Sequence, residues 1–219
     1  MTSNILKKNI PLSNFTTWRI GGPAEWIAEP KNLEEIKYLI NWIKTKKLPC
    51  NVIGAGSNLL INDEGIKGLS LCMRQLKGME IDKTTEILEV FSGEPLPKLA
   101  RKAAYMGLHG LEWAVGIPGT IGGAIVMNAG AQGHCISDYL ESITTISMNG
   151  EYKKLKAQDL NFGYRYSLLQ QKNLIVVSAR LKLESGHIKK IRQTTNDHLN
   201  HRLKTQPYQD QSCGSVFRN

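Results

Sequence analysis

The sequence has little of what marks membrane-spanning, secreted or zinc-binding chains. No stretch approaches the run of about 20 apolar residues that a membrane helix needs. The N-terminal segment MTSNILKKNIPLSNF has no apolar core followed by a small-residue cleavage site, so we expect no secretory signal. The cysteines are scattered as Cys50, Cys72, Cys135 and Cys213 and form no CxxC pair, which argues against a zinc site or a disulfide framework. We therefore expect a cytoplasmic chain with no metal and no membrane partner.

Composition excludes a disordered or fibrous chain, but the charge is unevenly spread. Hydrophobic residues are 41% and charged residues 21% of 219, ordinary for one large or two small globular domains. Residues 1–150 hold 15 basic and 14 acidic side chains, whereas residues 151–219 hold 13 and 5, so the net +9 is almost all in the last third. This excess suggests an anionic partner, although a solvated basic face explains it as simply.

Hydrophobic periodicity predicts alternating strands and helices. A strand at Ala24–Glu29, a helix capped by Asn32 with Glu35 completing a capping box, and a strand from Asn51 open the chain as a β-α-β unit. We expect this strand at Asn51–Gly54, further strand structure over residues 54–61 and a domain boundary after it, because a second strand-helix series begins near residue 68. The later expected elements are strands at 69–73 and 87–92, a helix from Pro95 to Gly107, strands near 139–148 and 174–184, and a helix over about 187–203.

A first glycine-rich segment follows the strand that starts at Asn51. It reads Gly54, Ala55, Gly56, Ser57, Asn58 and Leu59. Glycines at alternate positions let a backbone approach a ligand, and successive free N–H groups cradle anionic oxygens, with hydroxyl and amide side chains adding hydrogen bonds. A tight turn between strands is the plain alternative. The segment is not a Rossmann signature, because GxGxxG is not completed and no helix follows.

A second glycine-rich segment carries more glycine than a hairpin needs. Its ligand candidates are Gly116, Ile117, Pro118, Gly119, Thr120, Gly122 and Gly123. We expect a helix to start near Thr120, with N–H groups that can meet phosphate. Close packing of a helix on a sheet is the alternative.

Single polar residues in two further segments are weaker candidates. Arg165 lies between Tyr164 and Tyr166 and can present a fixed fork to a carboxylate, although it can equally be a surface arginine of a strand. Ser215 follows Gly214 and can be a nucleophile, a proton donor or a turn residue. His198 and His201 can share a helical face, but no carboxylate stands beside them at metal-ligand spacing.

The motifs taken in order resemble one family closely. Added to the segments above are NFTTWRIGG at 14–22, GLHGLEWA at 107–114, NAGA at 128–131 and GSVF at 214–217. Together they resemble the FAD-dependent UDP-N-acetylenolpyruvoylglucosamine reductases (UDP-N-acetylmuramate dehydrogenases) of bacterial peptidoglycan synthesis. The resemblance covers essentially the whole chain, and its specificity comes from the ordered combination.

The resemblance implies an α+β fold of the vanillyl-alcohol and xanthine oxidoreductase (PCMH) type. It implies FAD-binding subdomains at 1–62 and 63–186 and the start of a substrate domain at 187–219, which the chain leaves incomplete. It further implies non-covalent FAD, NADPH as electron donor, a nucleotide-sugar substrate, no nucleic acid, and a monomer. By position, Arg165 would pair with the enolpyruvyl carboxylate and Ser215 would donate a proton. Tyr164, Arg202, Lys204 and Asn219 would line the substrate site.

One departure from the family pattern and two alternatives stay open. The family chain continues to a glutamate of the acid site, so we expect this 219-residue chain to bind FAD and to lack reductase activity. The alternatives are a different flavin-dependent sugar or alcohol oxidoreductase of the same fold, or a basic RNA-binding module. The latter lacks a basic stripe interleaved with exposed aromatic residues.

Overall fold

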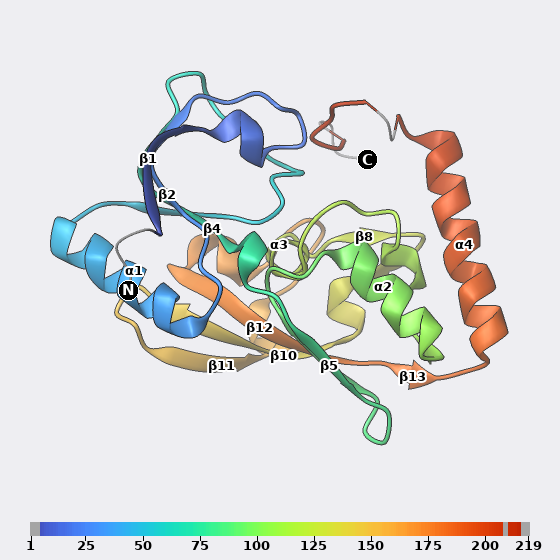
Figure 1. Cartoon of the computed structure of the whole chain (residues 1–219). Coiled ribbons are helices and arrows are strands. Elements are labelled where there is room, and N and C mark those ends of the chain that lie inside the picture. Colours follow the sequence, from blue (N-terminus) through green and yellow to red (C-terminus); the bar gives the residue numbers. More distant parts are fainter. Residues whose placement is uncertain (1–4, 208–209, 216–219) are drawn as a thin grey trace.

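The N-terminal part of the chain forms a four-stranded sheet (Figure 1). A computed structural model describes residues 5–207 and 210–215. In spatial order the strands of this sheet are β1 (Leu6–Pro11), β2 (Pro23–Ala28), β4 (Ile66–Cys72) and β3 (Cys50–Ile53). Strand β4 is parallel to both β2 and β3, whereas β1 is antiparallel to β2.

Two expectations about this part need correction. The strand structure expected to run to residue 61 ends at Ile53, and residues 54–62 are irregular, with Leu60 68% exposed. The segment expected to open a second series is β4, which pairs in the first sheet, so this sheet ends ten residues beyond the boundary expected at residue 62. Strand β1, which the sequence pattern did not indicate, adds its outer edge.

Helix α1 (Leu33–Lys46) confirms the predicted helix and its cap. The Asn32 side chain accepts a hydrogen bond from the Glu35 N–H at 2.9 Å, as a cap does. The expected capping box does not form, because the Glu35 carboxylate accepts from the N–H of Lys31, one residue before the cap, at 2.7 Å. The apolar face of α1 is buried with residues of both sheets, including Leu71 of the first sheet and Ile146 of the second. The helix therefore helps to join the two halves of the molecule.

The second sheet is entirely antiparallel. In spatial order its strands are β11 (Tyr152–Lys156), β10 (Leu140–Ser147), β12 (Leu174–Lys182), β6 (Ile87–Phe91) and β5 (Met79–Asp82). Neither edge strand was predicted from the sequence: β11 has mostly exposed side chains and little apolar alternation, whereas β5 alternates apolar and polar residues over only four positions.

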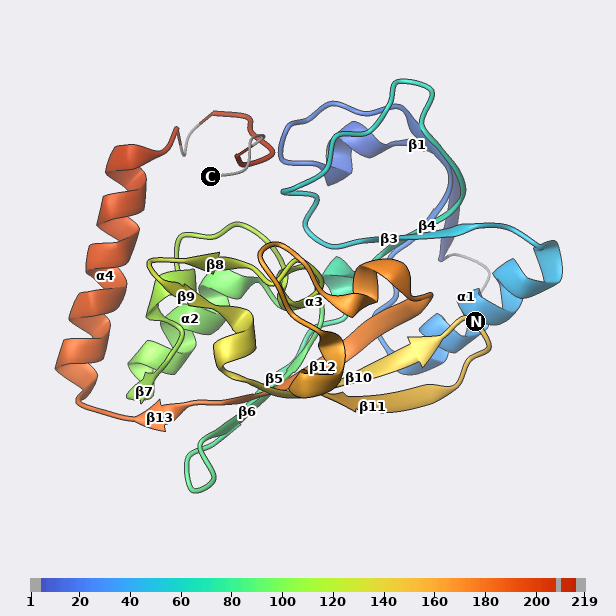
Figure 2. The same cartoon turned by 180° about the vertical axis from the view of Figure 1, so that it is seen from behind.

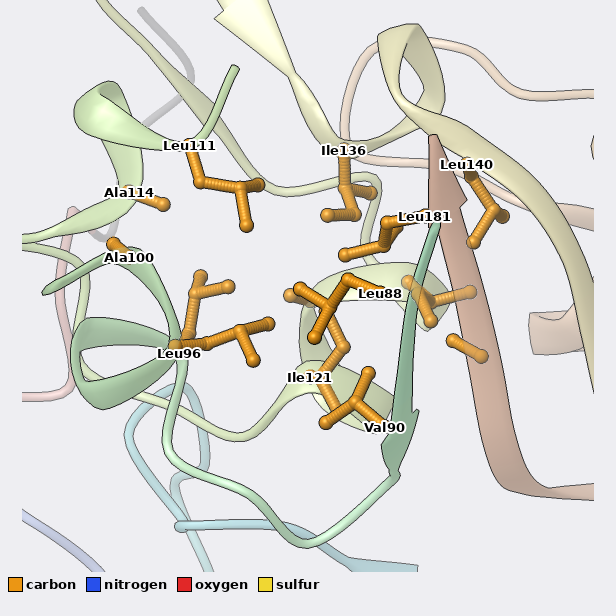
Figure 3. Packing of buried hydrophobic residues seen from close by; sticks show 14 of the residues in the cluster. Leu88, Val90, Leu96, Ala100, Leu111, Ala114, Ile121, Ile136, Leu140 and Leu181 are labelled. Carbon is orange, nitrogen blue, oxygen red and sulfur yellow. The ribbon is translucent and has the colours of Figure 1, made fainter. Parts of the chain in front are cut away.

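Helices cover one face of this sheet and bury the largest core cluster (Figures 2 and 3). They are α2 (Leu96–Tyr105), α3 (Ile121–Val126) and, outside α2, the long helix α4 (Ile188–Thr205). Leu88 and Leu181 of the sheet meet Leu96, Leu111 and Ile121 in this core. Two short pairs complete the fold: β7 (Leu108–His109) with β13 (Glu184–Ser185), and β8 (Gly130–Ala131) with β9 (His134–Cys135). Among the described residues, no helix combines the length and apolarity that crossing a bilayer requires.

Candidate functional site

The two glycine-rich segments meet directly in space, although the residues that touch, Ser57 and Pro118, are 61 positions apart in the chain. The Ser57 hydroxyl donates a hydrogen bond to the Pro118 carbonyl at 2.8 Å. A Cβ added to Gly54 would lie 2.7 Å from Thr120 Oγ1, so the absence of a side chain there lets the segments touch. The structure therefore joins residues 54–58, the first loop, and residues 116–120, the second loop, into one surface.

Glycine in the first loop serves internal packing. Gly56 has a φ of +70°, and a Cβ on it would overlap the carbonyl oxygen of Phe15. Its own carbonyl accepts a hydrogen bond from the N–H of Thr17 at 3.3 Å. The expectation that these glycines make room for a ligand is therefore wrong at Gly54 and Gly56, whose free space is taken by Thr120 and Phe15. Ser57 likewise uses its hydroxyl proton within the protein.

The backbone donors of the first loop are nevertheless available. Within residues 5–207 and 210–215, the N–H groups of Ala55, Gly56, Ser57 and Asn58 donate no hydrogen bond. Successive unbonded N–H groups create a partial positive charge and a concave set of donors, which suits phosphate oxygens. Residues 55–58 therefore offer four successive backbone donors, whereas Gly54 and Gly56 are required for packing, and anion binding at these donors stays a prediction.

The helix that follows the second loop, α3, has fewer free N–H groups than expected. Thr120 caps α3 as predicted, with its hydroxyl accepting from the Gly123 N–H at 3.4 Å. However, the N–H groups of Ile121 and Gly122 donate to the carbonyls of Glu94 and Ser92, both at 2.9 Å. The first turn of α3 is therefore not open to phosphate, which corrects the earlier expectation. Among the described residues, the N–H groups of Gly116, Gly119 and Thr120 have no acceptor, so the donors lie just before the helix.

Helix-to-sheet packing, the alternative for this segment, applies to one of its glycines. A Cβ on Gly122 would lie 2.8 Å from Ser92 Cβ, where α3 meets the end of β6. Gly119, in contrast, faces Ser57 of the first loop, with 3.5 Å between an added Cβ and Ser57 Oγ. Helix-to-sheet packing therefore explains Gly122, Gly119 lies at the contact between the two loops, and ligand binding by this segment stays a prediction.

A pocket of about 130 Å³ opens where α4 crosses the second loop. Its lining residues are Trp113, Gly116, Ala131, Gln132, His198, His201, Arg202, Thr205 and Gln206. A Cβ on Gly116 would overlap the Arg202 side chain, so glycine makes room for the arginine stem. Residues 198, 201, 202 and 205 share one helical face, as their spacing indicates. Thr205, Gln132 and Gln206 were not predicted from the sequence as site residues. Helical spacing could have indicated Thr205, whereas no sequence pattern indicated the two glutamines.

The two residues of α4 predicted to line the substrate site, Arg202 and Lys204, differ in whether they reach the pocket. Arg202 reaches the pocket, whereas Lys204 is exposed and does not line it. Asn219 lies outside the described residues.

Arg165 lies on a tight turn and not on a strand. Gly163 and Tyr166 pair across it through backbone hydrogen bonds of 3.0 and 3.2 Å, and Arg165 has a φ of +53°. The guanidinium stacks on the Tyr164 ring at 5.1 Å and donates through Nη2 to the Gly130 carbonyl at 3.0 Å. The ring does restrain the arginine, as expected from the flanking tyrosines, and the remaining donors of the fork stay exposed.

The segment that carries Ser215 returns from α4 to the first sheet. Thr17 Oγ1 donates to the Ser212 carbonyl at 2.5 Å, and Gly214 N–H donates to Ser212 Oγ at 3.0 Å. A Cβ on Gly214 would lie 3.9 Å from the Ser57 carbonyl oxygen. Figure 1 shows this segment crossing from α4 toward the lobe that contains β1 and β2. Ser215, the residue after Gly214, is exposed.

A buried thiol lies beneath the first loop. Cys72, at the end of β4, is 3.9 Å from the Gly54 carbonyl oxygen and 3.3 Å from Arg74 Nε. Burial raises the pKa of the Cys72 thiol, and the nearby Arg74 opposes that rise only in part. The thiol is therefore neutral at physiological pH and adds no negative charge beside the donors of the loop.

Comparison with known proteins agrees with this geometry. The family described as "FAD binding domain" matches residues 24–156. The UDP-N-acetylenolpyruvoylglucosamine reductase of Prochlorococcus marinus (strain NATL2A) is 76% identical over 219 residues, which is 100% of this chain and 75% of that protein. The enzyme of the same name from Synechococcus sp. (strain CC9605) is 54% identical over 212 residues, 96% of this chain and 71% of that one.

The chain belongs to the UDP-N-acetylenolpyruvoylglucosamine reductase family. Its fold is similar to the crystal structure of UDP-N-acetylenolpyruvylglucosamine reductase (MurB) from Thermus caldophilus, with a TM-score of 0.83 and 33% identity over 96% of this chain and 73% of that one. Alkyldihydroxyacetonephosphate synthase shares the fold alone, with a TM-score of 0.55 and 18% identity over 76% of this chain and 33% of that one. The FAD-binding α+β fold implied by the sequence resemblance is confirmed.

Proposed function

We propose that this chain provides the FAD-binding site and part of the substrate site of a UDP-N-acetylenolpyruvoylglucosamine reductase. The reaction reduces the enolpyruvyl ether of UDP-N-acetylglucosamine to the lactyl ether, UDP-N-acetylmuramate, with NADPH as electron donor, for peptidoglycan synthesis. The observation that carries the proposal is the joined pair of loops, whose N–H groups at Ala55–Asn58 and Gly119–Thr120 have no acceptor among the described residues. We place the reaction in the cytoplasm and expect a monomer.

The residues of the two loops fit a dinucleotide cofactor. The free N–H groups of residues 55–58 would hold pyrophosphate oxygens, and those of Gly116, Gly119 and Thr120 would hold adjoining polar atoms. When bound, FAD supplies the redox chemistry that links NADPH to the enolpyruvyl substrate. No residue of the loops is a cysteine or a histidine, the types that usually anchor flavin covalently, so the loops hold FAD without a covalent bond.

Arg165 binds the carboxylate of the substrate in this proposal. Its guanidinium is already restrained by Tyr164 and the Gly130 carbonyl, so little rotamer entropy is lost when it binds. A fixed positive fork beside the reacting carbons stabilises the negative charge that develops on the carboxylate side. Tyr164, half exposed, forms the wall of this position.

Ser215 holds the proton that the second reacting carbon receives. Thr17 and the Ser212 hydroxyl fix the segment before it, beside the first loop. A serine hydroxyl is a weak acid, so it can donate only to a carbon that has become a much stronger base. Arg202, packed over Gly116, adds positive charge for the anionic nucleotides.

Arg165→Lys tests the substrate role against a structural one. The lysine keeps the charge and loses the two-pronged fork, so substrate turnover by the full-length enzyme should fall by one to several factors of ten, at about 1.4 kcal/mol each. Flavin reduction by NADPH should change little. Equal loss in both half-reactions would contradict a carboxylate-binding role.

Release of the flavin distinguishes the alternatives. Acid precipitation of the yellow protein should leave free FAD in solution. Flavin that stays with the polypeptide would favour a covalent flavin oxidase, and a colourless chain that binds RNA would contradict the proposal.

A further inference from the structure

The turn that carries Arg165 is fixed to the C-terminal end of α3 through side chains that have no part in the chemistry so far described. Ser167 is fully buried, and its hydroxyl donates to the Val126 carbonyl at 2.7 Å. Gln170 Nε2 donates to the same Val126 carbonyl and to the Arg165 carbonyl, both at 3.0 Å. The turn is therefore held from both sides of its arginine.

Asn128 makes the most specific of these contacts. Its Nδ2 donates to the Gly163 carbonyl at 3.0 Å, while its Oδ1 accepts from the Ser137 N–H at 3.2 Å. One partner can only accept and the other can only donate, so this amide is satisfied in a single orientation. The side chain is 7% exposed and the residue has a φ of +41°, a conformation that asparagine tolerates better than most residues.

Asn128 lies in the chain between the second loop and Gly130, which contacts Arg165. The second loop leads straight into α3, which is only six residues long, and Asn128 follows its C-cap Met127. Gly130, two residues further on, accepts the hydrogen bond from the Arg165 guanidinium. One short rigid segment therefore touches the proposed flavin loop at one end and the arginine turn at the other.

We propose that Asn128 is a positioning residue that sets the location of the Arg165 guanidinium relative to the flavin loop. The inference rests on the proposed function, because it assumes that Arg165 binds the substrate carboxylate. Asn128 acts through the Gly163–Tyr166 turn and contacts neither substrate nor cofactor. Ser167 and Gln170 support the same turn from the neighbouring carbonyls.

Three variants separate the side chain from the backbone. Asn128→Asp keeps the shape and the acceptor for Ser137 but puts an oxygen against the Gly163 carbonyl. Asn128→Gly keeps the left-handed backbone and removes both hydrogen bonds. The matched control is Asn161→Asp, because Asn161 has a similar φ of +44° and its exposed side chain has no hydrogen bond to a described residue.

The first measurement is amide hydrogen exchange of the turn, which does not depend on any substrate. Exchange at Gly163 and Tyr166 should speed up about tenfold or more in both Asn128 variants, the equivalent of one lost hydrogen bond. The control should match the unaltered chain, and FAD occupancy should be unchanged in all of them. Unchanged exchange in Asn128→Asp, or a loss of FAD in step with it, would overturn the proposal.

The second measurement compares two ligands on the FAD-loaded chain, the enolpyruvyl sugar nucleotide and UDP-N-acetylglucosamine, which lacks the carboxylate. Asn128→Asp should reduce the preference for the carboxylate ligand about tenfold and should add nothing when combined with Arg165→Lys. Full additivity would show a merely structural role. A chain that binds the two ligands equally before any substitution would contradict the proposed function, and the exchange experiment would still decide whether Asn128 positions the turn.

Discussion

The two loops differ in how they keep backbone donors free. The first loop contacts the rest of the protein through a backbone carbonyl and through close packing at Gly54 and Gly56, where no Cβ intervenes. Four successive N–H groups, Ala55 to Asn58, therefore stay unbonded among the described residues. The second loop leads into a helix whose first N–H groups are already bonded to Glu94 and Ser92, which leaves only those upstream of the helix. A glycine-rich segment and a helix start therefore do not by themselves identify where an anion binds. We expect an anion to bind where backbone donors are unpaired.

The largest expected effect comes from a glycine of the first loop. Gly56→Ala forces an alanine to a φ of +70° and against the Phe15 carbonyl, which should cost about 3 kcal/mol of folding stability and lower the Tm by about 6–12 °C. Thermal unfolding of the FAD-free chain measures this loss. Because the cost is structural, Gly56 variants are poor tests of flavin binding.

Gly123→Ala, in the first turn of α3 just after the second loop, is the opposite case. An added Cβ would lie 3.6 Å from Thr120 Oγ1, an ordinary contact, and the residue is helical. The unfolding free energy should therefore stay the same or rise by about 0.5–1 kcal/mol. A loss of unfolding free energy as large as that of Gly56→Ala would contradict this difference between the two glycine positions.

Ser57→Ala tests the hydrogen bond that joins the loops. Without the 2.8 Å bond to Pro118, the loops can separate, and the affinity for FAD should fall up to about tenfold, the range of one hydrogen bond. Titration of the apoprotein with FAD by flavin fluorescence gives the change. The control is Ser178→Ala on β12, whose hydroxyl has no hydrogen bond to a described residue and whose loss should not affect FAD.

The smallest effect concerns the connection that brings α4 over the second loop. Hydrogen bonding from Ser185 and from Lys182 lowers the pKa of the partly exposed Glu86 carboxyl below its usual 4.5. A lowered folded-state pKa gives stability that is present above the unfolded value and disappears as the pH falls through the folded value. Glu86→Gln should therefore be slightly less stable at pH 7, and the difference should vanish toward pH 3. Urea unfolding at the two pH values measures it, and an equal difference at both would contradict this origin.

The sequence predicted this architecture best where periodicity and caps act locally. Helix α1 with its Asn32 cap, helix α2 between Pro95 and Gly107, and the strands around β10 and β12 follow from such patterns. The pairing of β4 with the first sheet did not, since the partner of a strand depends on long-range packing that spacing does not encode. The edge strand β11 has mostly exposed, charged side chains, and the edge strand β5 is only four residues long, so neither gave a clear strand pattern.

The sequence predicted which segments form the candidate site, but it did not predict which of their backbone groups are already hydrogen-bonded. The order of the motifs predicted Gly54–Asn58, Gly116–Thr120 and Arg165 as parts of a site, and the structure places the first two segments in contact. The acceptors Glu94 and Ser92, which occupy the α3 donors, come from a distant loop and left no trace in the pattern near Thr120. The same holds for Phe15, whose carbonyl explains Gly56.

Amide hydrogen exchange with and without FAD tests the central claim most directly. The account predicts that FAD slows exchange at Ala55, Gly56, Ser57 and Asn58, and at Gly119 and Thr120, while Ile121 and Gly122 are protected in both states because their donors are already bonded. FAD binding that leaves residues 55–58 unchanged, or that adds protection only at Ile121 and Gly122, would contradict it.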